Sequence, residues 1–88
     1  MECFLDVSQL EPPEPLERAL AAAETLPPGA YLRLIHRRYP CLLEAQLAER
    51  GFRCEVVTGE DDTTETFIWH DGDDSARDAA RRHMASLS

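Results

Sequence analysis

The chain has 88 residues, 43% of them apolar, and a net charge of −8 at pH 7; this fits one small domain with a modest hydrophobic core. The negative charge argues against nucleic acid and anionic membrane as partners, because both require a basic protein surface. No apolar run approaches the roughly 20 residues that cross a bilayer, and the N-terminus lacks the pattern of a secretory signal. We therefore expect a cytoplasmic protein that binds neither nucleic acid nor membrane.

The first half of the chain predicts a strand followed by a helix. Residues 2–7 are typical of a strand, in which we expect Phe4 and Leu5 to enter the core. Apolar residues between positions 13 and 26 recur at spacings of three and four and predict an amphipathic helix. The Pro-Pro-Gly sequence at 27–29 then stops this helix and turns the chain.

An acidic, proline-rich corner joins this strand to this helix. Pro13 and Pro15 fit the opening turn of the helix, because the N–H that proline lacks would be unpaired there, and Pro12 comes just before it. Glu11 and Glu14 place negative charge at the positive end of the helix dipole. These five residues line our first candidate site. The two glutamates can attract a cation, although stabilising the helix start is their simpler role.

The second half predicts another strand and helix and then a hairpin. Residues 31–36 form the second predicted strand, and Pro40 begins a helix that Gly51 ends. Residues 52–57 and 65–70 are two strands joined by an acidic turn.

These elements predict an α/β (α+β) two-layer sandwich with the order β-α-β-α-β-β, formed by residues 1–72. The first crossover should make strands one and two parallel, so the four-stranded sheet is mixed, and both helices cover one face. The other face is then partly open to water or to a partner. Tyr31 and Trp69 are candidate contacts on it, or residues that cover the core. We expect residues 73–88 to be a polar tail, weakly helical or disordered, because an alanine stripe buries little area.

Two motifs resemble the TusA/SirA-like sulfur-carrier superfamily, and more closely a branch of it known only as a domain of unknown function. They are Leu5-Asp6-Val7-x-x-Leu10-x-Pro12-Pro13-Glu14-Pro15 and Leu26-Pro27-Pro28-Gly29. The resemblance runs from about Phe4 to Asp71 and implies the same two-layer fold. In the sulfur carriers the corner reads Cys-Pro-x-Pro, and that cysteine carries a persulfide. Pro12 holds its position here and has no nucleophile, so the resemblance implies the fold without the sulfur-relay chemistry.

Cys41 is the candidate reactive thiol. It should lie in the first turn of the second helix, at the same end of the sheet as the proline corner, where a helix dipole lowers the pKa of a thiol. The plainer interpretation is a small, half-buried apolar residue. His36, at the end of the second strand, is a candidate neighbour that can bind a metal or transfer a proton, or a hydrogen-bonded structural residue.

No catalytic constellation and no zinc-ligand spacing occurs in the sequence, so we assign no catalytic residue, metal or cofactor and do not expect an enzyme. We expect a binding or adaptor domain that contacts another protein with a basic surface. Two alternatives stay open. One is a sulfur or redox carrier that uses Cys41, and the other is a small regulatory module that binds a ligand or metal near His36 and the proline corner.

Overall fold

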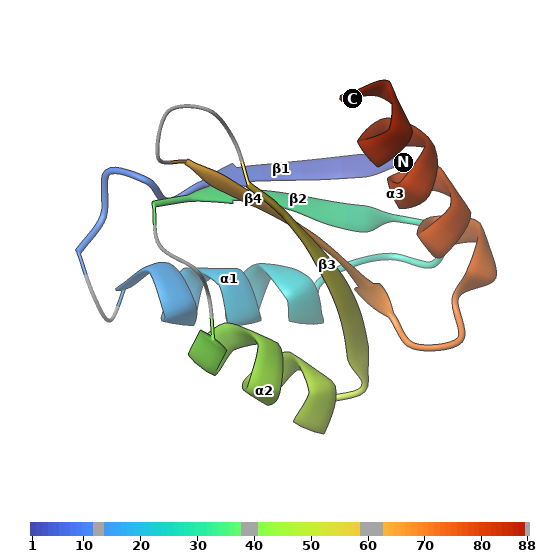
Figure 1. Cartoon of the computed structure of the whole chain (residues 1–88). Coiled ribbons are helices and arrows are strands. Elements are labelled where there is room, and N and C mark those ends of the chain that lie inside the picture. Colours follow the sequence, from blue (N-terminus) through green and yellow to red (C-terminus); the bar gives the residue numbers. More distant parts are fainter. Residues whose placement is uncertain (12–13, 38–40, 59–62, 88) are drawn as a thin grey trace.

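The computed structural model describes residues 1–11, 14–37, 41–58 and 63–87, with the side chain of Cys41 outside this description. Strands and helices follow the order β-α-β-α-β-β-α (Figure 1). They are β1 (Glu2–Asp6), α1 (Glu14–Glu24), β2 (Tyr31–His36), α2 (Cys41–Glu49), β3 (Phe52–Thr58), β4 (Thr64–His70) and α3 (Asp74–Ser86).

Within the described ranges, four strands form one mixed sheet in the order β1-β2-β4-β3. β1 and β2 are parallel, with Glu2 opposite Tyr31 and Asp6 opposite Ile35. β4 is antiparallel to both β2 and β3. The α+β class, the parallel pair and the hairpin predicted from the sequence are therefore confirmed, and β1 and β3 are the edge strands.

One face of the sheet packs against α1 and α2 to form the larger core (Figure 1). β2 contributes Leu32 and Leu34, which are almost fully buried, because alternate residues of a strand share one face. The helices contribute a stripe of small and large apolar residues: Ala19, Leu20, Ala23, Leu43 and Leu47. Among the described helices, none is long and apolar enough to cross a membrane.

β1 turns Cys3 and Leu5 toward this core, and Phe4 away from it. Cys3 and Leu5 are partly buried against the core, whereas Phe4 is 56% exposed. The expectation that Phe4 is a core residue is wrong. Successive side chains of a strand point to opposite faces, so Phe4 shares its face with the charged residues Glu2 and Asp6.

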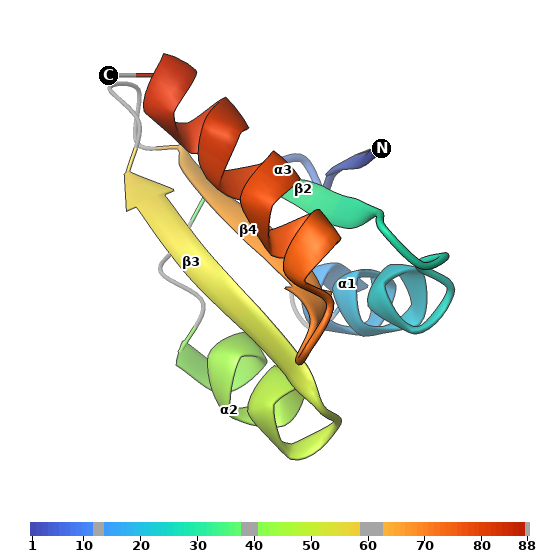
Figure 2. The same cartoon turned by 90° about the vertical axis from the view of Figure 1, so that its right-hand side faces the viewer.

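The opposite face of the sheet is covered in part by α3, which runs across it (Figure 2). Ala76 and Ala80 are fully buried there, against Tyr31, Phe67 and Trp69. The segment that we expected to be a loosely attached tail thus contains a third helix, which closes a second, smaller core.

The burial of Tyr31 and Trp69, which are 5% and 4% exposed, decides between the two interpretations of these residues: they cover a core and are not open contacts. An aromatic side chain buries about 150–250 Å², several times what an alanine methyl contributes. The sheet therefore supplies most of the apolar area under α3. The alanines let the helix backbone approach the rings closely, so a stripe that looks weak in the sequence is sufficient for docking.

Asp73 fixes the start of α3 and ties it to the turn before β2. Its carboxylate accepts hydrogen bonds from the backbone N–H of Gly29 at 2.8 Å and of Ala76 at 3.1 Å. These two bonds hold the pKa of Asp73 below its usual value. Gly29 has a φ of +82°, in the left-handed region that favours glycine, which lets the turn present this N–H.

The close approach of α3 to the aromatic cluster predicts that Ala80→Leu destabilises the protein. Forcing extra methylenes into a filled site costs about 1–3 kcal/mol. Urea unfolding, followed by far-UV circular dichroism, measures this free energy. Ala85→Leu is the matched control, because Ala85 lies on the exposed side of the same helix. An equal effect of the two substitutions would show that α3 does not pack tightly on the sheet.

Candidate functional site

The corner singled out in the sequence lies at the edge of the sheet where β1 and β2 end. Because these two strands are parallel, α1 and α2 both start at this edge, α1 at Glu14 and α2 at Cys41 (Figure 1). Pro12 and Pro13 lie outside the described residues. The structure therefore brings the starts of the two helices to one edge, as expected.

The described acidic residues of the corner lie at the surface. The backbone N–H of Glu14 donates to the carbonyl of Glu11 at 3.1 Å, and the Glu14 carboxylate is 3.8 Å from the Arg18 guanidinium. Both side chains of this pair are more than half exposed, and Pro15 is partly buried. Exposed pairs of this kind contribute little stability. The arrangement is that of a helix start stabilised by its own charges.

His36 lies inside the protein, only 6% exposed. Its Nε2 is 2.7 Å from the hydroxyl of Thr66, a fully buried residue of β4. The structure thus places His36 in a buried polar contact between β2 and β4. In the part of the chain that is described, no three His, Cys, Asp or Glu residues are grouped so as to hold a metal ion.

The two thiols whose surroundings are described both pack against the larger core. Burial, together with the nearby carboxylates of Glu44 and Glu55, raises the pKa of Cys54 to about 11. Cys54 is therefore protonated at neutral pH and is a poor nucleophile. Cys3, in β1, is partly buried, and Cys41 is the first residue of α2.

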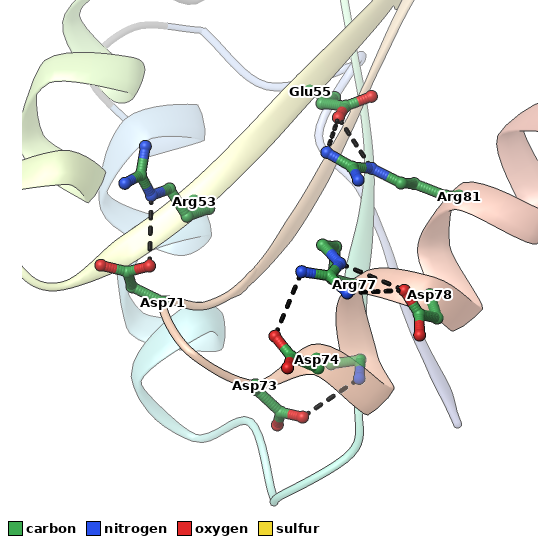
Figure 3. Close-up of polar contacts among 9 residues, drawn as sticks. Arg53, Glu55, Asp71, Asp73, Asp74, Arg77, Asp78 and Arg81 are labelled. Carbon is green, nitrogen blue, oxygen red and sulfur yellow. Dashed lines mark hydrogen bonds and ion pairs between the residues drawn. The ribbon is translucent and has the colours of Figure 1, made fainter.

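A shallow groove of about 370 Å³ lies on the other side of the sheet, between β3 and the first half of α3 (Figure 3). Trp69 and the arginines Arg53, Arg77 and Arg81 line it, together with several carboxylates. Sequence reasoning missed this groove, because it depends on the docking of α3.

Each groove arginine is already paired with a carboxylate (Figure 3). The pairs are Arg53–Asp71 at 3.2 Å, Arg77–Asp74 and Arg77–Asp78 at 3.1 Å, and Arg81–Glu55 at 3.0 Å. The last pair links α3 to β3, and the first links β3 to the loop before α3. The groove therefore offers an anion no unpaired arginine, and only the Arg81–Glu55 pair joins α3 to the sheet.

A polar cluster on the same face of the sheet joins β1, β2 and α3. The Tyr31 hydroxyl donates to Glu2 Oε1 at 2.9 Å, and His83 Nδ1 lies 2.8 Å from the same oxygen and 3.1 Å from the Tyr31 hydroxyl. Burial, followed by the hydrogen bond and the charge of Glu2, raises the pKa of Tyr31 to about 12. The cluster connects the first strand to the last helix.

On the same face of the sheet, the exposed Phe4 lies beside the partly buried Arg33. The Arg33 guanidinium lies 5.3 Å from the centre of the Phe4 ring and makes two hydrogen bonds to Glu65, at 2.8 and 3.3 Å. The Glu65 hydrogen bond raises the pKa of Arg33 further, so this arginine keeps its charge. We call Phe4, Arg33 and Glu65 the Phe4 patch. The alternation of Phe4 with core-facing neighbours was the sequence signal for it.

The raised pKa of Tyr31 predicts a loss of stability at alkaline pH. An unfolded tyrosine has a pKa of about 10. Between pH 10 and 12 the unfolded chain therefore releases this proton while the folded protein keeps it, and rising pH favours unfolding. Urea unfolding from pH 9 to 12 should show the parent losing stability relative to Tyr31→Phe. Other groups that titrate here are shared by both proteins and cancel. If the free energies of unfolding of the parent and of Tyr31→Phe changed in parallel over this pH range, the prediction would be contradicted.

Comparison with known proteins identifies a family. No curated protein and no solved structure matches the chain significantly. A family model described as "Uncharacterized conserved protein (DUF2249)" matches residues 4–70, from β1 to the end of β4. The match covers more than half of the chain and ends before α3. The chain therefore belongs to the DUF2249 family of uncharacterized conserved proteins.

Proposed function

We propose that this chain is a non-catalytic adaptor domain that binds another protein through the Phe4 patch. The exposure of Phe4 is the observation that carries this proposal. Phe4 is 56% exposed on a sheet face whose other described aromatic residues, Tyr31, Phe67 and Trp69, are buried under α3. Aromatic and arginine side chains are enriched in the cores of protein interfaces, and Arg33 lies against the Phe4 ring.

The charge of the chain supports a partner with a basic surface. The net charge is −8, and the acidic residues Glu2 and Asp6 lie on either side of Phe4 in β1. Complementary charge accelerates association and selects the partner more than it adds affinity. Binding through this patch should therefore become slower as the salt concentration rises.

A photo-crosslinking amino acid at position 4 of the full chain tests the adaptor function. Leu42 is the matched control, because it is an exposed apolar residue on α2, 71% exposed. We expect position 4, and not position 42, to capture a discrete protein in cells. With that protein purified, Phe4→Ser should weaken binding by more than about 30-fold, as loss of an interface anchor does. Leu42→Ser should leave the affinity unchanged. Capture at both positions, or a Phe4→Ser variant that binds normally, would contradict the proposal.

The second candidate function is a sulfur or redox carrier of the TusA/SirA type that uses Cys41. Two observations favour it over the regulatory ligand or metal module: Cys41 begins α2, and α2 starts at the same sheet edge as α1. A thiol at a helix start is stabilised as thiolate. The buried contact of His36 with Thr66 gives the regulatory module no comparable support.

Alkylation by iodoacetamide at pH 7 tests the carrier function. In single-cysteine variants, we expect Cys41 to react more than about tenfold faster than Cys54, whose pKa is raised to about 11. Cys41 should also accept persulfide sulfur from a cysteine desulfurase, whereas Cys41→Ser should not. Equal alkylation rates and no persulfide on Cys41 would remove this candidate.

A further inference from the structure

We infer that the outer edge of β1 pairs with a strand of the protein partner, and that this strand carries basic residues on both sides of an apolar residue. This inference rests on the proposed adaptor function and specifies its binding mode. An extended segment that adds to a sheet edge gains affinity from main-chain hydrogen bonds and specificity from alternate side chains.

The hydrogen bonds of β1 determine which of its backbone groups are directed outward. The carbonyl of Met1 accepts from the N–H of Tyr31 at 3.1 Å, and the N–H of Val7 donates to the carbonyl of Ile35 at 2.8 Å. In a parallel ladder, alternate residues of a strand bond to the same neighbour. The odd-numbered residues of β1 therefore bond to β2, and the N–H and C=O groups of Glu2, Phe4 and Asp6 point to the free edge.

The same three residues also share one face of the sheet, as the contacts of two of them show. Glu2 accepts from Tyr31, and Phe4 lies against Arg33. A strand added to this edge would therefore place its side chains beside an acidic, an aromatic and an acidic residue in turn. The other edge strand, β3, offers no such row, because no large apolar side chain that is exposed in the described residues lies on it.

Charge excludes a second copy of this chain as the added strand. A symmetric antiparallel pair centred on Phe4 would place Glu2 of each copy opposite Asp6 of the other. Like charges directly opposite each other destabilise a strand pair, and each copy carries a net charge of −8. If the register is shifted by two residues, only two of the three residues Glu2, Phe4 and Asp6 of each copy remain paired with the other copy, so fewer main-chain hydrogen bonds form. A heterologous strand with the pattern basic–x–apolar–x–basic instead places opposite charges across both outer positions.

A symmetric peptide, acetyl-Thr-Arg-Thr-Val-Thr-Arg-Thr-amide, is the probe for this edge, with the full chain labelled for NMR. We expect saturable binding and at least tenfold slower hydrogen exchange at the amides of Phe4 and Asp6, with no change at Leu5. The same peptide with glutamate in place of arginine should bind at least about threefold more weakly, because exposed charge pairs contribute modestly.

N-methylated peptides separate strand addition from contact through side chains alone. In an antiparallel pair, the valine N–H faces β1 and the N–H of the central threonines faces away. Methylating the valine nitrogen should abolish binding, and methylating a central threonine nitrogen should not. Binding that survives both, or that is lost with both, overturns the inference. If both methylated peptides still bind at Phe4, the adaptor function stands and only the strand addition fails.

The double variant Glu2→Gln, Asp6→Asn tests the charge pattern while keeping the local hydrogen bonds. In the parent chain, Tyr31 donates a hydrogen bond to the Glu2 carboxylate, and Ser8 donates to the Asp6 carboxylate. The amide oxygens of glutamine and asparagine can still accept these hydrogen bonds. We expect this variant to bind the arginine and glutamate peptides with equal affinity. Its affinity for the arginine peptide should be about three- to tenfold lower than that of the parent chain. An unchanged preference for arginine, or a parent chain that dimerises through β1, would contradict the pairing.

Discussion

The central strands β2 and β4 carry large apolar side chains on both of their faces, and the rest of the structure depends on covering both. Leu32 and Leu34 face α1 and α2, while Tyr31, Phe67 and Trp69 face α3. A sheet covered on one side only would expose three aromatic rings to water, with a large loss of hydrophobic stabilisation. The last helix is thus part of the folding unit that buries the centre of the sheet.

This constraint explains which parts of the fold could be read from the sequence. Strands, the first two helices and the parallel pair follow from local periodicity and from turn residues such as the proline and glycine at 27–29. The docking of α3 does not, because its own stripe consists of small residues and the apolar area comes from distant strands. Phe4 was misassigned for a related reason. Its size favours the core, but the positions of Cys3 and Leu5 on the opposite face decide where it points.

The candidate site, like the fold, could be predicted from the sequence only in part. The sequence correctly placed the two helix starts at one edge, since that depends only on the chain order and on β1 and β2 being parallel. It could not show that His36 contacts Thr66 or that Arg53 and Arg81 are paired with Asp71 and Glu55, because those partners lie far away along the chain. The described arginines of the groove between β3 and α3 are thus all paired, and the Phe4 patch is distinguished from this groove by an exposed aromatic residue.

The contact between Glu2 and His83 ties the beginning of the sequence to its end. These residues lie near opposite ends of the sequence, yet Glu2 Oε1 and His83 Nδ1 are 2.8 Å apart. A contact of this kind closes a long loop, and its entropic cost grows with the length of chain between the two residues. The first strand therefore completes its contacts only after the last helix has docked on the sheet.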